Sequence, residues 1–122
     1  MKTHSRSTEA TVTHHLEAFF RKDLDGVVED YADEAVFIAP GGPLLGRAAI
    51  RKFFTAFIET MPAGFLEAFA MREQRFAGEL GYIVWDVAPW VRFATDTFVV
   101  RDGKIVLQTF AADPPTWTAA SK

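Results

Sequence analysis

The spacing of apolar positions predicts a helix at the start of the chain. Ser7 or Thr8 can cap this helix, with Glu9 in its opening turn. Its apolar residues recur at steps of three and four, at Val12, Leu16, Phe19 and Phe20. His15 borders this apolar face, whereas His14 points away from it.

A second, shorter helix is predicted after Asp23, which fits an N-cap. Leu24, Val27, Val28 and Tyr31 mark one side of it, and the helix frays at residues 32–34. Gly26 weakens it, because glycine has low helix propensity. Residues 35–39 then form a short β-type run, and the turn cluster Pro40-Gly41-Gly42-Pro43 prevents extended chain from continuing.

The third predicted helix, residues 47–61, has the broadest apolar stripe. It consists of Ile50, Phe53, Phe54, Phe57, Ile58 and Met61, and Pro62-Ala63-Gly64 ends the helix. From there the pattern is one of strands separated by turn signals, at residues 65–76, 80–87, 91–101 and 104–112. Three helices followed by three antiparallel hairpins predict an α+β fold with the helices on one face of the sheet. We expect one domain over residues 1–122, ordered from about residue 8 to about residue 113.

The strand at residues 80–87 has apolar residues on both faces. If the helices cover one face, Ile83, Trp85 and Val87 leave an apolar patch on the other. Such patches usually mark an interaction surface, so we predict a homodimer formed through the outer face of the sheet.

Composition narrows the class of protein. The chain has 122 residues, 49% hydrophobic, with twelve phenylalanines that argue for a wide aromatic core or cavity. A net charge of -3 and scattered Lys and Arg residues disfavour nucleic-acid binding. The absence of cysteine excludes disulfides and thiolate chemistry. The polar N-terminus and the lack of a long apolar run predict a cytoplasmic protein with no membrane span.

Three polar residues stand among apolar neighbours and are the candidate catalytic groups: His15, Tyr31 and Asp96. An apolar setting raises the pKa of a carboxylic acid, which makes Asp96 a possible general acid. The alternative for Asp96 is a solvated strand residue that accepts from Thr95 or Thr97. His15 can relay protons or be a hydrogen-bonded boundary residue, and Tyr31 can orient a substrate oxygen or belong to the core.

Other chemistries are disfavoured. The glycines at residues 41, 42 and 46 lack the spacing of a phosphate-binding loop. His14 and His15 are adjacent and cannot grip one metal together, so we expect neither a metal nor a cofactor. No Gly-x-Ser-x-Gly motif is present, which disfavours serine hydrolysis.

The turn at Arg101-Asp102-Gly103 decides what faces Asp96. A three-residue loop needs positive φ only at Gly103 and places Gln108 opposite Asp96, on the same face. A two-residue turn at Asp102-Gly103 places Thr109 there instead and sends Gln108 to the other face. We favour the three-residue loop, because the tighter turn also demands positive φ of Asp102.

Four local strings, in this order, resemble the nuclear-transport-factor-2-like superfamily, in particular its SnoaL-like and ketosteroid-isomerase-like members. They are Asp23-Leu24-Asp25-Gly26, Tyr31-Ala32-Asp33-Glu34-Ala35, Leu45-Gly46-Arg47-Ala48-Ala49-Ile50-Arg51, and Asp96-Thr97-Phe98 with Asp102-Gly103-Lys104-Ile105. The resemblance implies a cone-shaped α+β barrel with a strongly curved, mostly antiparallel sheet. It also implies a deep apolar pocket and a homodimer.

The resemblance also implies site residues. The position of the ketosteroid isomerase base is Ala39 here, directly before Pro40, so that base is missing and ketosteroid isomerisation is disfavoured. The tyrosine of the isomerase oxyanion site falls at His15, and its protonated aspartic acid falls at Asp96. The expected substrate-binding residues are Phe19, Phe37, Phe54, Phe57, Val84, Phe98, Gln108 and Phe110. The arginine and carboxylates typical of the epoxide hydrolase branch are not recognisable.

This fold hosts many activities, so two functions stay open. One is a cofactor-independent isomerase, cyclase or lyase that acts on an apolar carbonyl or polyketide-like compound through Asp96, His15 and Tyr31. The other is a binding or assembly module whose pocket holds an apolar ligand or is filled by its own side chains.

Overall fold

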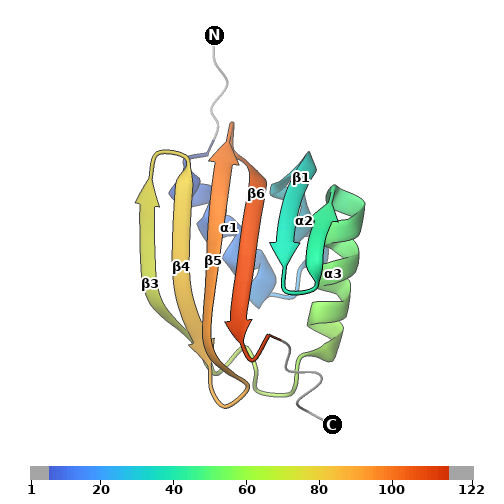
Figure 1. The fold of residues 1–122 in the computed structure, drawn as a ribbon, viewed down its shortest axis with the longest axis vertical. Coiled ribbons are helices and arrows are strands. Elements are labelled where there is room, and N and C mark those ends of the chain that lie inside the picture. Colours follow the sequence, from blue (N-terminus) through green and yellow to red (C-terminus); the bar gives the residue numbers. More distant parts are fainter. Residues whose placement is uncertain (1–5, 116–122) are drawn as a thin grey trace.

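The computed structural model describes residues 6–115 and forms a curved sheet with helices packed on its concave side (Figure 1). Its helices are α1 (Thr8–Phe20), α2 (Leu24–Glu29) and α3 (Arg47–Thr60). Its strands are β1 (Tyr31–Ala39), β2 (Gly42–Leu45), β3 (Phe69–Ala77), β4 (Leu80–Val87), β5 (Val91–Arg101) and β6 (Lys104–Asp113). The predicted α+β class and the helices' position on one face are confirmed.

The two N-terminal helices begin where the sequence predicts. The Ser7 side chain accepts from the Ala10 amide at the start of α1, and Asp23 accepts from the Gly26 amide at the start of α2. Gly26 is also needed because there is no space for a side chain at this position. A Cβ at this position would lie 2.6 Å from Oδ2 of Asp23 and 3.1 Å from Cβ of Ala18, so a side chain would disturb the cap.

The six strands run in the order β2-β1-β6-β5-β4-β3. The predicted hairpins from β3 to β6 are present, and β1 pairs in parallel with β6. This parallel pairing joins the β1–β2 hairpin to the four-stranded part of the sheet, so β6 and β5 lie at its centre (Figure 1). α1 packs over β4 and β5 and α3 packs over β1 and β2, and the core forms between these helices and the sheet.

Three element boundaries differ from the prediction. Tyr31 begins β1 instead of closing α2, because α2 ends at Glu29 and the Tyr31 carbonyl accepts from Nε of Arg47 at 2.8 Å. The turn cluster does not stop the sheet. Pro40-Gly41 makes a tight connection, and Gly42, at φ 123°, starts β2. β3 begins at Phe69 because residues 63–68 are turns.

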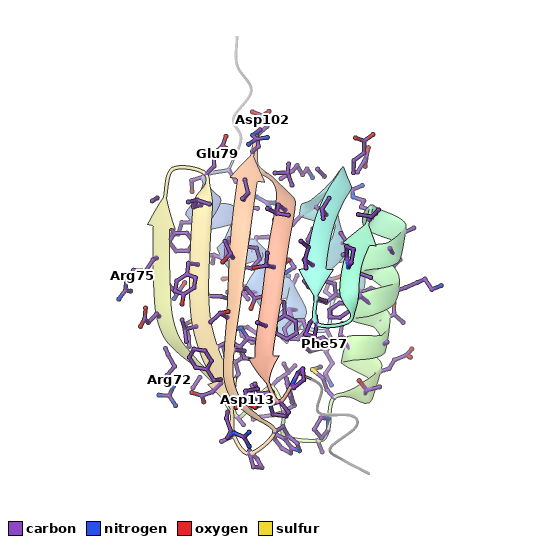
Figure 2. The ribbon with its side chains drawn as sticks, in the orientation of Figure 1. Phe57, Arg72, Arg75, Glu79, Asp102 and Asp113 are labelled. Atoms are coloured by element: carbon purple, nitrogen blue, oxygen red, sulfur yellow. The ribbon has the colours of Figure 1, made fainter. Side chains whose placement is uncertain are left out.

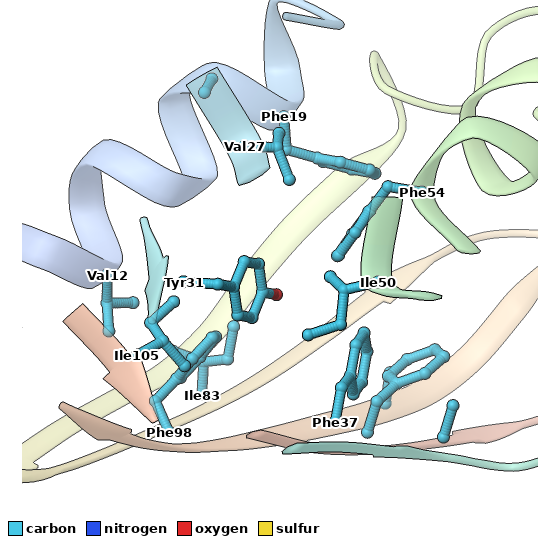
Figure 3. Packing of buried hydrophobic residues seen from close by; sticks show 14 of the residues in the cluster. Val12, Phe19, Val27, Tyr31, Phe37, Ile50, Phe54, Ile83, Phe98 and Ile105 are labelled. Atoms are coloured by element: carbon cyan, nitrogen blue, oxygen red, sulfur yellow. The ribbon is translucent and has the colours of Figure 1, made fainter. Parts of the chain in front are cut away.

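The core is a cluster of aliphatic and aromatic side chains between the helices and the sheet. Figure 3 shows Tyr31 inside it, with its hydroxyl oxygen pointing into the middle of the cluster. Ile83, Trp85 and Val87 belong to this core, with exposed fractions of 1%, 7% and 0%. Their predicted place on the outer face is therefore wrong, and β4 instead exposes Leu80 and Tyr82. Figure 2 shows the ribbon with the side chains of the described residues.

Within the described part of the chain, no helix has the length and apolar character required to cross a membrane.

Candidate functional site

An aromatic pocket lies between α1, α3 and the concave face of the sheet. We call it the inner pocket; its cavity volume is about 50 Å³. It is lined by His15, Leu16, Phe19, Phe37, Phe53, Phe54, Phe57, Phe69, Ile83, Trp85, Asp96, Phe98, Gln108 and Phe110. Only a few of these side chains are polar, so the chemistry of the pocket rests on them.

Asp96 is the ionisable group at the centre of the polar part. It projects from β5 and is only 6% exposed. The indole Nε1 of Trp85 donates to its Oδ1 at 2.7 Å, and Nε2 of Gln108 donates to its Oδ2 at 2.8 Å. An indole N–H can only donate, so Asp96 must accept from it. Each carboxylate oxygen therefore accepts from an N–H group, an arrangement that suits the ionised form.

Burial in the aromatic pocket raises the pKa of Asp96 to about 6, and the hydrogen bonds from Trp85 and Gln108 oppose this rise. The direction of the shift agrees with the expectation for a carboxyl in apolar surroundings. At neutral pH the group is mostly a carboxylate, which differs from the protonated acid that the family resemblance implied for this position.

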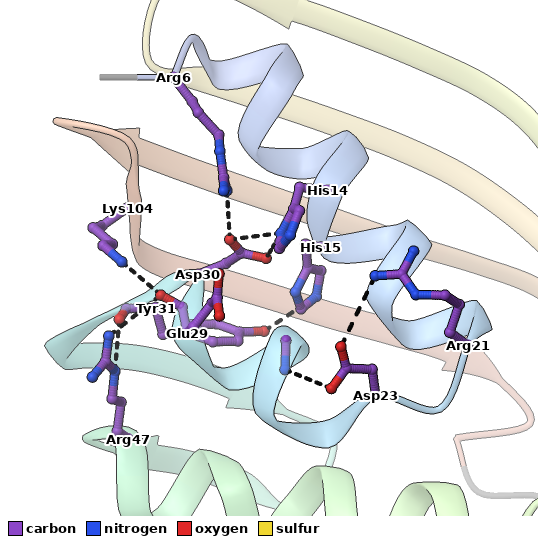
Figure 4. A network of polar contacts seen from close by, with 11 residues as sticks. Arg6, His14, His15, Arg21, Asp23, Glu29, Asp30, Tyr31, Arg47 and Lys104 are labelled. Atoms are coloured by element: carbon purple, nitrogen blue, oxygen red, sulfur yellow. Dashed lines mark hydrogen bonds and ion pairs between the residues drawn. The ribbon is translucent and has the colours of Figure 1, made fainter. Parts of the chain in front are cut away.

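Gln108 links Asp96 to Tyr31. The Tyr31 hydroxyl donates to Oε1 of Gln108, which turns the amide so that its nitrogen faces Asp96. On the other side of the hydroxyl, Nε2 of His15 lies at 3.5 Å (Figure 4). A chain of polar contacts thus runs from α1 through β1 and β6 to β5.

His15 is neutral in this environment. Burial lowers its pKa to about 4, against the opposing effect of the Asp30 charge and the Val27 backbone. Three rings meet it edge-on, those of Tyr31, Phe54 and Phe98, with centroids 5.3 to 5.8 Å away. Its Nδ1 is buried and makes no hydrogen bond of normal geometry within the described residues. A neutral imidazole here can orient Tyr31, but it carries no charge to a ligand.

The hairpin that sets Asp96 beside Gln108 differs from the predicted one. The connection is the two-residue turn, with φ of 54° at Asp102 and 74° at Gly103, so the three-residue loop is wrong. A register shift beside Val99 then displaces β6 by one residue and restores the alternation of faces. Asp96 pairs with Phe110, and Gln108 pairs with Phe98. The two polar side chains still share a face and meet diagonally.

Most residues predicted for the site lie around this pocket. The lining contains His15, Asp96, Phe19, Phe37, Phe54, Phe57, Phe98, Gln108 and Phe110. Tyr31 is outside the lining but reaches it through Gln108. Val84 is buried, yet it alternates with Ile83 and Trp85 and is not in the lining. Ala39 lines an adjoining groove instead.

Trp85 lines the pocket, although the sequence pattern predicts it on the outer face. Its alternation with Ile83 and Val87 is clear, but either face of β4 fits an apolar row. The residues that alternate with them indicate the correct face. Tyr82 and Asp86 are more compatible with water than Ile83 and Trp85, so they belong on the outer face of the sheet. With Trp85 turned inward, its N–H finds the buried acceptor that an indole in a core requires.

A second polar cluster lies behind the pocket, at the start of β1. The carboxylate of Asp30, 1% exposed, accepts from Nη1 of Arg6 at 2.9 Å and contacts Nδ1 of His14 at 2.8 Å (Figure 4). His14, Glu29 and Asp30 bring ligand-type atoms within 4.8 Å of one another. Because Arg6 and His14 already contact the Asp30 oxygens, the cluster joins the N-terminal part of α1 to the junction between α2 and β1.

Comparison with known proteins gives one family match and many similar folds. A family model described as a SnoaL-like domain matches residues 12–108. No curated protein matches the sequence. A solved structure from Kribbella flavida DSM 17836 is similar with a TM-score of 0.75 and 21% identity, over 92% of this chain and 92% of that one.

Two further structures carry names that bear on chemistry. A protein from Sinorhizobium meliloti described as a "putative polyketide cyclase" has a TM-score of 0.70 and 20% identity, over 83% of this chain and 93% of that one. TerC, co-crystallised with polyporic acid, has a TM-score of 0.68 and 21% identity, over 88% of this chain and 92% of that one. At such identities the likeness establishes a shared fold.

Proposed function

The chain belongs to the SnoaL-like domain family, within the nuclear-transport-factor-2-like superfamily, and we propose that it is a cofactor-independent enzyme acting on an apolar carbonyl compound. Asp96 is its general base. The observation that carries this proposal is a buried carboxylate in an aromatic pocket, with one N–H donor on each oxygen. These donors hold the carboxylate in place and leave further lone pairs for a proton from a substrate.

The proposed step is a proton transfer from carbon. Asp96 takes the proton from a carbon next to the carbonyl, and the C–H electron pair moves into the carbonyl to give an enolate. The proton on Asp96 then returns to another carbon of a conjugated enolate, which is an isomerisation. In the alternative, the enolate carbon attacks a second carbonyl and closes a ring, and the oxygen of that carbonyl takes the proton from Asp96, which restores the carboxylate. A base with a pKa near the working pH suits such a transfer, and the pKa of Asp96, about 6, meets this condition.

The neighbouring polar groups supply orientation and an oxygen partner. One amide hydrogen of Gln108 goes to Asp96, and the second is available to donate to the enolate oxygen. Tyr31 fixes the amide by donating to Oε1, and neutral His15 lies beside the Tyr31 hydroxyl. Gln108 is therefore the proposed catalytic donor, while Tyr31 and His15 are positioning residues.

The comparisons support the substrate class. One similar structure is described as a "putative polyketide cyclase", and another was crystallised with polyporic acid. The apolar lining of the inner pocket suits the body of such compounds, and its few polar groups suit a single carbonyl.

A non-catalytic binding or assembly module is the second candidate. It is favoured by the inner cavity of about 50 Å³, which phenylalanine side chains have largely filled. Typical ligand pockets have volumes of about 300–1,000 Å³. Under this alternative Asp96 would have a structural role. Its replacement would change the stability of the protein and would not change any reaction rate.

The test uses 2-tetralone, an apolar ketone with exchangeable hydrogens next to its carbonyl. We expect the protein to accelerate deuterium incorporation in D₂O, followed by NMR, above the buffer rate. Asp96→Asn should lower this acceleration by about 10² to 10⁴, the usual contribution of a general base. Asp86→Asn is the matched control, because Asp86 lies on β4, partly exposed, and pairs with Arg72. Equal rates for both variants would refute the proposal.

A second copy of the chain is the proposed cover for the outer sheet face. The residues that support a homodimer are not those predicted from the sequence. They are the large apolar side chains that point outward, Ile38, Leu45, Leu80, Tyr82 and Phe93, with exposed fractions of 38% to 69%. They come from four strands of one face, and such patches are typical of protein interfaces.

A further inference from the structure

A second, larger hollow adjoins the inner pocket, and we call it the outer groove. Its volume is about 630 Å³. It is lined by Ala39, Pro40, Gly41, Gly42, Pro43, Leu44, Phe53, Ala56, Phe57, Thr60, Phe110 and Pro115. Phe53, Phe57 and Phe110 also line the inner pocket, so these three rings stand between the two hollows. We call them the aromatic partition.

The inner pocket alone is too small for a substrate. A buried water requires about 10–15 Å³ of such space, so a cavity of about 50 Å³ holds only a few waters. A bicyclic ketone that places its carbonyl beside Asp96 must therefore displace part of the wall. Phe53 and Phe57 are only half-buried, and Figure 2 shows Phe57 between α3 and the sheet. Their centroids lie 5.6 Å apart, and that of Phe57 lies 6.3 Å from that of Phe110.

The outer groove offers apolar contact and no charge. Among its described lining residues, Thr60 is the only one with a polar side chain, and its hydroxyl already donates to the Ala56 carbonyl at 2.8 Å. No Lys or Arg belongs to this described lining. A phosphate or carboxylate tail would find no counter-charge here, whereas rings or alkyl chains would bury apolar area.

We propose that the substrate is an elongated, uncharged molecule with its carbonyl end at Asp96 and its apolar body in the outer groove, and that the aromatic partition opens to admit it. This inference rests on the proposed function, because that function places the carbonyl at Asp96. Phe57 and Phe53 are then specificity-determining residues. Ala39 and Ala56 keep the groove open by having small side chains.

The experiment compares two uncharged probes by isothermal titration calorimetry. 2-Naphthol presents a hydroxyl that can donate to Asp96, and 6-phenyl-2-naphthol adds one ring along its long axis. We expect the added ring to improve the affinity of the unmodified protein by about tenfold or more, because it becomes buried in the groove. Equal affinities for the two probes, or no binding of either, would overturn the proposal.

Ala56→Trp fills the groove from α3. It should abolish the gain from the added ring, so that the two naphthols bind this variant with similar affinity. Ala48→Trp is the matched control, because Ala48 is exposed on the same helix and outside the groove lining. An equal loss for both probes in Ala56→Trp, or retention of the gain, would count against the subsite.

Phe57→Ala tests the aromatic partition separately. Joining the two hollows should raise the association rate of 2-naphthol about tenfold, measured by stopped-flow tryptophan fluorescence. An unchanged association rate in a folded variant would show that the partition does not limit entry. These binding results are independent of turnover. If Asp96→Asn leaves deuterium exchange unchanged while the length dependence holds, the proposed function fails and the subsite remains.

Discussion

The indole N–H of Trp85 donates to Oδ1 of Asp96 at 2.7 Å, across the β4–β5 pairing of the sheet. The Trp85 ring is held in place by stacking on Phe110, with an interplanar angle of 2°, and on Phe69, with an angle of 26°. A rigid donor thus fixes one oxygen of a buried carboxylate. Under the proposed function, this contact orients the carboxylate that acts as the base.

The first prediction concerns the Trp85 hydrogen bond. Trp85→Phe keeps an aromatic ring but removes the donor to the ionised carboxylate, so the pKa of Asp96 should rise further above about 6. Carbon-detected NMR of the Asp96 carboxyl measures this. Trp90→Phe serves as a control, since Trp90 packs on Phe65. An Asp96 pKa that does not respond to Trp85→Phe would contradict the assigned role of the indole.

Gln108→Leu should also raise the pKa of Asp96, and it should lower the free energy of unfolding. It removes the second donor to Asp96 and leaves the Tyr31 hydroxyl without its acceptor. An unsatisfied buried polar group costs about 1–3 kcal/mol in the free energy of unfolding. Urea unfolding gives this quantity. The double variant Tyr31→Phe/Gln108→Leu should recover part of the loss, and a purely additive loss would contradict the Tyr31–Gln108 contact.

The dependence of stability on pH contains two opposing contributions. The pKa of Asp96 is raised from 3.8 to about 6 in the folded protein, so its contribution is present in acid and is lost as pH rises through about 6. The pKa of His15 is lowered from 6.5 to about 4, so its contribution is present above 6.5 and is lost as pH falls toward 4. Between these limits the two contributions largely cancel.

Single substitutions should reveal each contribution. From pH 4.5 to pH 6.5, the unfolding free energy of Asp96→Asn should rise relative to the unmodified protein by about 2–3 kcal/mol, and that of His15→Gln should fall by a similar amount. Urea unfolding at pH 4.5, 5.5 and 6.5 measures both. Parallel curves for the three proteins would show that neither side chain has a shifted pKa.

The outer face of the sheet predicts an oligomer. The protein should be a dimer by light scattering at micromolar concentration, and Tyr82→Glu should shift it toward the monomer by placing a charge in the apolar patch. Ala48→Glu, which adds the same charge on exposed α3, should leave the dimer intact. A monodisperse monomer for the unmodified protein would contradict the proposed dimer.

The sequence was sufficient for the fold class and for the face shared by Asp96 and Gln108, but it did not determine how that face arises. A three-residue loop without a bulge and a two-residue turn with a bulge give the same alternation of faces. The preference for the three-residue loop rests on the cost of a positive φ at Asp102, yet aspartate tolerates this region better than most residues. The bulge itself leaves no local signal near Val106.

Other errors have similar physical causes. Tyr31 fits the apolar side of a predicted helix, and only its long-range pairing with Ile105 of β6 shows that it begins a strand. The sequence pattern places Trp85 on the wrong face because both faces of β4 carry apolar residues. The size of the inner pocket depends on how the rings of Phe53 and Phe57 pack, which no spacing rule provides.

The most direct measurement for the central claim is the pH–rate profile of deuterium exchange into 2-tetralone. If Asp96 is the base, the protein-catalysed rate should rise about tenfold per pH unit in acid and level off above about pH 6, where the carboxylate is formed. Asp96→Asn should abolish that profile, while Asp86→Asn should keep it. A rate that is independent of pH between 4.5 and 7.5, or a profile unchanged by Asp96→Asn, would contradict the account.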